Sequence, residues 1–171
     1  MRQQWFASAV FGLLVVGAHG QTCNAARKAT YTSPDGSLVA VVQPSTKPQT
    51  CESAVELKTG SGKVLARRSY QSDDGSHGYG VVRAHWTPDS KFFLVSLGSS
   101  GGHQPWHSPV EFFSRERSDF FSLDDALSNA IMNPEFEVTA PDNVTVELYF
   151  GNKTLTVQLS SLHATKALPT N

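Results

Sequence analysis

One pattern of strands and turns occurs twice between residues 29 and 123, and it constrains the fold more than any other feature. In each copy a short apolar run leads into a turn of the form (Ser/Thr)-Pro-Asp-(Gly/Ser), and a longer apolar run follows. The two turns are residues 33–36 (SPDG) and 87–90 (TPDS), and their prolines lie 54 positions apart. Proline presets the backbone of such a turn, aspartate hydrogen-bonds its own main chain, and glycine accepts a positive φ. A period of this length indicates repeated β-units.

Further strand signals follow each turn. In the first copy we expect strands over residues 29–32, 38–42, 54–57 and 64–67. In the second copy we expect them over residues 81–86, 92–97, 110–113 and 120–123. The last third predicts one short helix and three half-buried strands, over residues 124–131, 136–140, 144–150 and 155–159. The predicted fold is mainly β: antiparallel β-meanders in two propeller-blade-like units, packed as one small domain with one short α-helix.

These two copies resemble the WD40-like repeats of TolB-type β-propellers. In that family Ser-Pro-Asp-Gly precedes an inner strand of the blade, and a hairpin with a glycine turn follows. The resemblance covers residues 29–123 and implies two blade-like sheets. A closed propeller needs at least four blades, so two copies do not form one by themselves. The resemblance carries no activity with it, because function lies in sites and not in folds.

The N-terminus has the pattern of a secretory signal peptide. Arg2 supplies a positive start, residues 7–16 form a short apolar run, and Ala18 and Gly20 are small residues at the cleavage positions. We expect a signal peptide at 1–20, a single β-rich domain at 21–162 and a flexible tail at 163–171. The mature protein would then be secreted or periplasmic, and no segment approaches the roughly 18 apolar residues of a transmembrane helix.

Cysteine content and charge narrow the possibilities further. Cys23 and Cys51 are the only cysteines, and in an oxidising compartment they would most simply form a disulfide bond with each other. A net charge of −1 without a basic cluster argues against a nucleic-acid partner. Asn143 and Asn152 begin glycosylation sequons, which matter only in a eukaryotic source.

The segment 98–109, GSSGGHQPWHSP, is the strongest candidate for a site. It combines glycines, two histidines and a tryptophan at the end of an apolar strand, and loops on rigid scaffolds are where binding residues gather. An aromatic face can stack on a sugar or anchor a partner, although the tryptophan can also fold back against the sheet. The candidate contact residues are Gly101, Gly102, His103, Trp106, His107 and, from the loop before the strand at 81–86, Tyr79.

Two catalytic patterns overlap this loop. His103 and His107 have the four-residue spacing of two zinc ligands, but Pro105 argues against the helix that would bring them together. Further ligands would have to come from His77, His85 or Glu111. Residues 98–102 also satisfy G-x-S-x-G, the motif of the α/β-hydrolase nucleophile, but the alternating strands and helices of that fold are missing.

Three functions remain open on the sequence. The first is a non-catalytic binding or interaction module with an unknown protein or small ligand as its partner and no cofactor. The second is a small zinc-dependent enzyme that uses His103 and His107. The third is a purely structural envelope protein, in which the loop only ends strands; self-association is compatible with all three.

Overall fold

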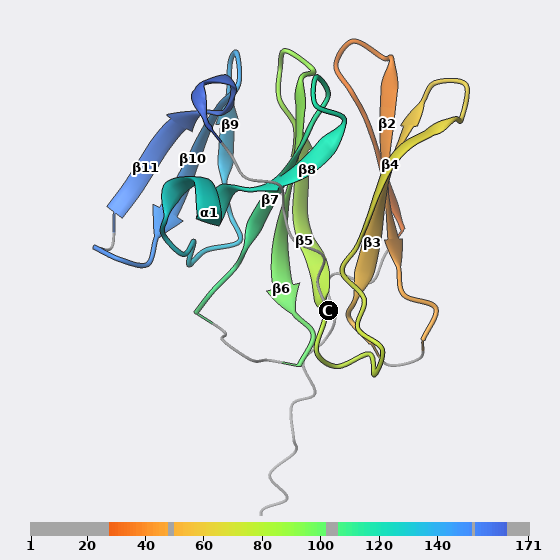
Figure 1. The fold of residues 1–171 in the computed structure, drawn as a ribbon, viewed down its shortest axis with the longest axis horizontal. Helices are drawn as coiled ribbons and strands as arrows, with labels where there is room; N and C mark the ends of the chain where they lie inside the picture. The colour runs from red at the N-terminus through yellow and green to blue at the C-terminus, as the bar shows by residue number, and fades with distance from the viewer. Residues whose placement is uncertain (1–27, 48–49, 102–105, 152, 164–171) are drawn as a thin grey trace, which may run out of the picture.

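The computed structural model describes residues 28–47, 50–101, 106–151 and 153–163, and within these ranges the protein is mainly β (Figure 1). The first sheet contains β1 (Ala29–Thr32), β2 (Leu38–Pro44), β3 (Ser53–Thr59) and β4 (Val64–Ser69). The second contains β5 (Tyr79–Trp86), β6 (Phe92–Ser99), β7 (Val110–Ser114) and β8 (Asp119–Ser122). The third contains β9 (Glu137–Thr139), β10 (Asn143–Leu148) and β11 (Lys153–Gln158). A helix, α1 (Leu123–Leu127), precedes the third sheet, and a 3-10 turn, η1 (Leu159–Ser161), follows it.

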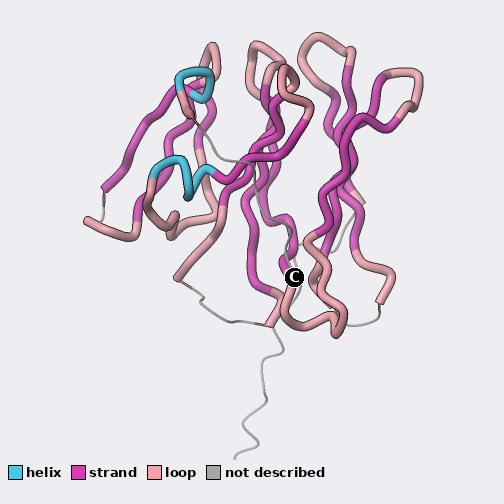
Figure 2. The backbone as a smooth tube through the Cα atoms, viewed as in Figure 1, coloured by secondary structure: helices cyan, strands magenta, loops and turns pink. Residues whose placement is uncertain are grey.

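Every pairing within the three sheets is antiparallel, and the sheets stand side by side as layers (Figures 1 and 2). Alternation along the strands explains the layers, because successive side chains point to opposite faces of a sheet. On β6, Phe93 and Val95 pack toward the first sheet, while Phe92 and Leu94 pack toward the third. The second sheet is therefore covered on both faces, and one apolar core lies on each side of it.

The third sheet repeats the pattern of the other two. Its turn contains Pro141 and Asp142, and Pro141 lies 53 positions after Pro88. The strand order β9, β10, β11 corresponds to the first three strands of each four-stranded sheet. The chain thus forms three antiparallel sheets, whereas the sequence analysis found the repeated pattern in only the first two.

Neighbouring Pro-Asp turns contact one another. The main-chain N–H of Asp35 donates to Ser90 Oγ at 3.0 Å, and the N–H of Asp89 donates to the carbonyl of Pro141 at 3.3 Å. Arg115, in the turn between β7 and β8, forms an ion pair with Asp35 at 2.6 Å. Hydrogen bonds from Ser33, Ser37 and the Arg115 side chain hold the pKa of Asp35 far below its usual range. The repeated turn therefore links the sheets as well as reversing the chain.

The predicted helix differs from the structure in where it ends. The helix ends at Leu127 instead of residue 131, because Ser128 takes a left-handed conformation that closes it. Ile131 then bridges Leu148 as part of the third sheet. Ser122 caps the helix N-terminus by accepting from the N–H of Asp125.

Several predictions fall on residues outside the described ranges. These are the signal peptide at 1–20, most of the tail at 163–171, the residue Cys23 of the predicted disulfide, and the sequon residue Asn152. Among the residues that the structure does describe, none lies in a helix long and apolar enough to cross a membrane.

Candidate binding surface

The loop between β6 and β7 is described at both ends, while Gly102 and His103 lie outside the described residues. Gly101 is exposed, and the Trp106 side chain is 43% exposed instead of covering the end of the sheet. Tyr79 begins β5 and packs against the core between the first two sheets. The ring contacts of Trp106 are with His107, at 5.5 Å between centroids, and with Tyr149, at 4.6 Å.

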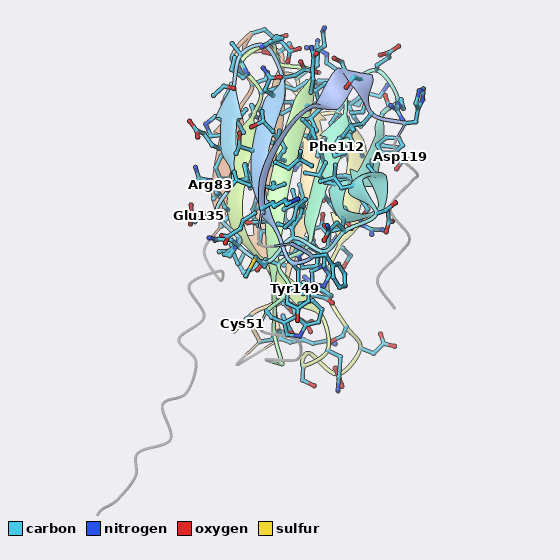
Figure 3. The ribbon with its side chains drawn as sticks, turned by 90° about the vertical axis from the view of Figure 1, so that its left-hand side faces the viewer. Cys51, Arg83, Phe112, Asp119, Glu135 and Tyr149 are labelled. Carbon is cyan, nitrogen blue, oxygen red and sulfur yellow. The ribbon has the colours of Figure 1, made fainter. Side chains whose placement is uncertain are left out.

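Trp106, Tyr149 and Phe150 form a cluster of exposed rings, called here the aromatic cluster. Tyr149 and Phe150 occupy the turn after β10, where they are 40% and 68% exposed. Their rings meet edge to face at 5.2 Å. Figure 3 shows Tyr149 at the lower end of the third sheet, the end opposite η1. A contiguous group of large exposed rings is a candidate interaction surface.

Main-chain hydrogen bonds hold the turn of the aromatic cluster against the segment after α1. The N–H of Tyr149 donates to the carbonyl of Ala130 at 2.8 Å. The N–H of Phe150 donates to Asn129 Oδ1 at 3.2 Å, and Asn129 Nδ2 donates back to the carbonyl of Phe150 at 3.4 Å. The exposed rings therefore stand on a fixed backbone, which lowers the entropic cost of binding.

A pocket of about 390 Å³ adjoins the cluster. Its lining includes Phe150, His107, Asp124, Asp125 and Asn129. Asp124 is fully engaged: its carboxylate accepts from the N–H groups of Val110 and Ile131 and lies 2.9 Å from His107 Nε2. The contact with Asp124 fixes the His107 ring, and both side chains are largely buried.

The serine of the G-x-S-x-G motif has a structural role. Ser100 Oγ lies 3.0 Å from the carboxylate of Glu52 and 3.0 Å from the carbonyl of Gly78, and the two acceptors share its single hydroxyl hydrogen. Glu52 is fully buried and also accepts from the N–H and hydroxyl of Ser72 and from the N–H of Gly78. A Cβ on Gly78 would lie 2.3 Å from the Tyr70 carbonyl, so only glycine fits there. Glu52 thus connects the start of the loop between β6 and β7 to the first sheet. The hydroxyl of Ser100 is used in this connection and does not have the geometry of an activated nucleophile.

Glu111, a candidate metal ligand in the sequence, instead joins two sheets. Arg68 on β4 donates to it through Nε at 3.0 Å and Nη2 at 2.8 Å, and the hydroxyl of Tyr70 donates at 2.9 Å. Burial and the Glu111 charge raise the pKa of Tyr70 well above its usual value. Burial lowers the pKa of Arg68, but the bonds to Glu111 outweigh it and the net shift is upward.

The other histidines considered as metal ligands have partners of their own. His77 pairs with Asp74 in the exposed loop before β5, and His85 Nδ1 lies 2.5 Å from the Trp86 carbonyl. Among the described residues no group of three or more His, Cys, Asp or Glu side chains is arranged to hold a metal. Because His103 lies outside these residues, zinc binding by His103 and His107 stays a prediction.

Sequence reasoning missed Tyr149, Phe150 and Glu52. The expected strand 144–150 included both aromatic residues, whereas β10 ends at Leu148. Their signal was two bulky rings beside Gly151 and Asn152, at a turn where small and polar residues are usual. Glu52 follows Cys51 and precedes an apolar strand, and no local pattern marks it for burial. Comparison with known proteins finds no family model and no curated protein that matches this chain.

Proposed function

We propose that this is an exported, non-catalytic module that binds a partner through the aromatic cluster and the adjoining pocket. The observation that carries the proposal is the exposure of Trp106, Tyr149 and Phe150 together, at one end of a rigid scaffold. Exposed aromatic anchors beside a pocket are the usual centre of a binding surface, because a ring contributes a large contact area at low entropic cost. The catalytic motif over residues 98–102 supports no enzyme, since its serine is bonded to Glu52.

Site-specific photocrosslinking in the exporting host tests the proposal. A benzoylphenylalanine at position 150 should give a discrete adduct, because this side chain lies in the cluster. The matched control carries the same group at Val64, which is 48% exposed on β4. Adducts that are absent at 150, or equal at both positions, would refute the proposed surface.

Fluorescence provides a check on the exposure itself. Once residues 1–20 are removed, Trp86 and Trp106 are the only tryptophans, and Trp86 is buried while Trp106 is exposed. Iodide should quench the Trp86→Phe variant strongly and the Trp106→Phe variant only weakly. Weak quenching of both variants would show that Trp106 is covered and unavailable to a partner.

A further inference from the structure

The charge around the aromatic cluster indicates which partner it fits. Asp124 and Asp125 line the pocket together with His107, and none of its lining residues in the described part of the chain is a lysine or arginine. Asp124 is held by three contacts within the protein, so its negative charge is fixed at the pocket wall. Asp125 is exposed, and its carboxylate makes no hydrogen bond or ion pair with any described residue. An unpaired carboxylate in a pocket attracts a cation.

The ring of Phe150 lines the same pocket and adds to this preference. It is the most exposed large apolar side chain among the described residues. The face of an aromatic ring carries partial negative charge and attracts an ammonium or guanidinium group placed over it. A cation in the pocket would therefore meet a carboxylate and a ring at the same time.

The arrangement of the rings disfavours a sugar as the ligand. Trp106 and Tyr149 are inclined at 38°, and Tyr149 and Phe150 at 81°. Stacking along a sugar chain requires open ring faces in one plane, whereas these three rings are inclined to one another. A cluster of inclined rings fits an apolar side chain better, as at the centre of protein interfaces.

We propose that this surface takes a peptide segment of a protein partner in which a lysine or arginine stands beside an apolar side chain. The basic side chain would enter the pocket toward Asp125 and Phe150, and the apolar one would lie on Trp106 and Tyr149. The inference rests on the proposed function and names the chemistry of its partner.

Selection from a random peptide library displayed on phage tests this inference with the full exported chain as bait. Clones that also bind the Phe150→Ser variant are removed first. The remaining peptides should be enriched in Lys or Arg next to an apolar residue, and their affinity should fall with rising salt. A glycan array probed with the same protein tests the alternative that this surface binds a sugar.

Synthetic versions of the selected peptides then give affinities by fluorescence anisotropy. Phe150→Ser should weaken binding tenfold or more, as for a central anchor. Asp125→Asn should weaken it roughly two- to fivefold, within the range for a solvent-exposed ion pair. The matched control, Glu116→Gln in the exposed turn between β7 and β8, should leave the affinity unchanged. Thermal unfolding of each variant verifies that it is folded.

Three results would overturn the inference: no enriched peptides, enriched peptides without a basic residue, or affinities that Asp125→Asn does not change. Binding to glycans that depends on Phe150 would also overturn it. In each of these cases an adduct at position 150 in the crosslinking experiment would leave the proposed function standing. Loss of that adduct would remove both proposals together.

Discussion

The buried carboxylate of Glu52 offers the sharpest test of how the loop is anchored, and Glu52→Gln is the substitution to make. The glutamine keeps the shape of the side chain and removes its charge. Oε1 of Glu52 accepts from the Ser72 hydroxyl, the Gly78 N–H and the Ser100 hydroxyl, and Oε2 accepts from the Ser72 N–H. If the glutamine oxygen takes the place of Oε1, the three hydrogen bonds to that atom remain. The glutamine NH2 group then takes the place of Oε2 and faces the Ser72 N–H, so two donors meet.

The magnitude follows from these four contacts. Hydrogen bonds to a charged group contribute about 1 kcal/mol more than neutral ones, so the three remaining bonds lose about 3 kcal/mol together. The unsatisfied Ser72 N–H adds about 1–3 kcal/mol. A neutral amide costs less to bury than a carboxylate, which returns about 2 kcal/mol. We expect the free energy of unfolding to fall by about 2–4 kcal/mol at pH 7.

The difference in stability between the wild type and Glu52→Gln should also depend on pH in a defined direction. Burial raises the pKa of Glu52, but the hydrogen bonds from Ser72, Gly78 and Ser100 outweigh it, so the folded-state pKa lies below the ordinary value of 4.5. A lowered pKa means that the stabilisation is complete above the unfolded-state pKa and is lost as the pH falls through the folded-state pKa. The difference between the wild type and Glu52→Gln should therefore shrink as the pH falls below about 4.5.

Urea unfolding followed by circular dichroism, from pH 7 downward, measures both effects. Glu116→Gln serves as the control, because Glu116 is exposed and its carboxylate makes no contact with any described residue. The reasoning is refuted if Glu52→Gln changes the free energy of unfolding by less than about 0.5 kcal/mol, the usual size of a neutral surface effect. A difference that stays constant on acidification would refute it equally.

Three further outcomes are expected. Glu111→Gln removes the carboxylate that the largely buried Arg68 side chain contacts and should cost about 3–5 kcal/mol in urea unfolding; a loss below about 1 kcal/mol would contradict the buried pair. Ser100→Ala should lower the free energy of unfolding by about 1 kcal/mol. A fluorophosphonate probe, which labels activated serines, should label neither this variant nor the wild type. Labelling that requires Ser100 would instead support the hydrolase motif. Purified protein should hold well below one equivalent of zinc; stoichiometric zinc that disappears in a His103→Ala/His107→Ala variant would favour the enzyme alternative.

Most strands could be predicted because their signals are local. The turns at 33–36 and 87–90 carry their own hydrogen bonds: the Ser33 and Thr87 hydroxyls each donate to the aspartate two positions on and accept from the N–H five positions on. The apolar runs after them become β2 and β6 with nearly the expected bounds. Turn chemistry and alternation require no knowledge of distant contacts, so the sequence shows them directly.

The three strands of the third sheet were expected, but their likeness to the other two sheets was missed because the turn between β9 and β10 departs from the pattern. Ala140 stands where the other copies have Ser33 and Thr87, so no hydroxyl marks the start of the turn. The carboxylate of Asp142 accepts from the Ser160 N–H beyond β11, a contact 18 residues away. The helix was overextended for a related reason: Leu127 and Ile131 contribute to the same core, but Ile131 does so as part of a sheet.

The aromatic cluster, too, could be predicted only in part from the sequence. Trp106 stood out within an unusual loop, whereas Tyr149 and Phe150 look like the end of an apolar strand until the strand is seen to end at Leu148. A turn gives no structural reason for two large rings, and a phenylalanine that is 68% exposed forgoes most of the roughly 2–3 kcal/mol that burial would contribute. The ring centroid of Tyr149 nevertheless lies 4.6 Å from that of Trp106, which belongs to the loop between β6 and β7. Neither the turns nor the cores require this meeting, and this is why the proposed binding surface is placed at the cluster.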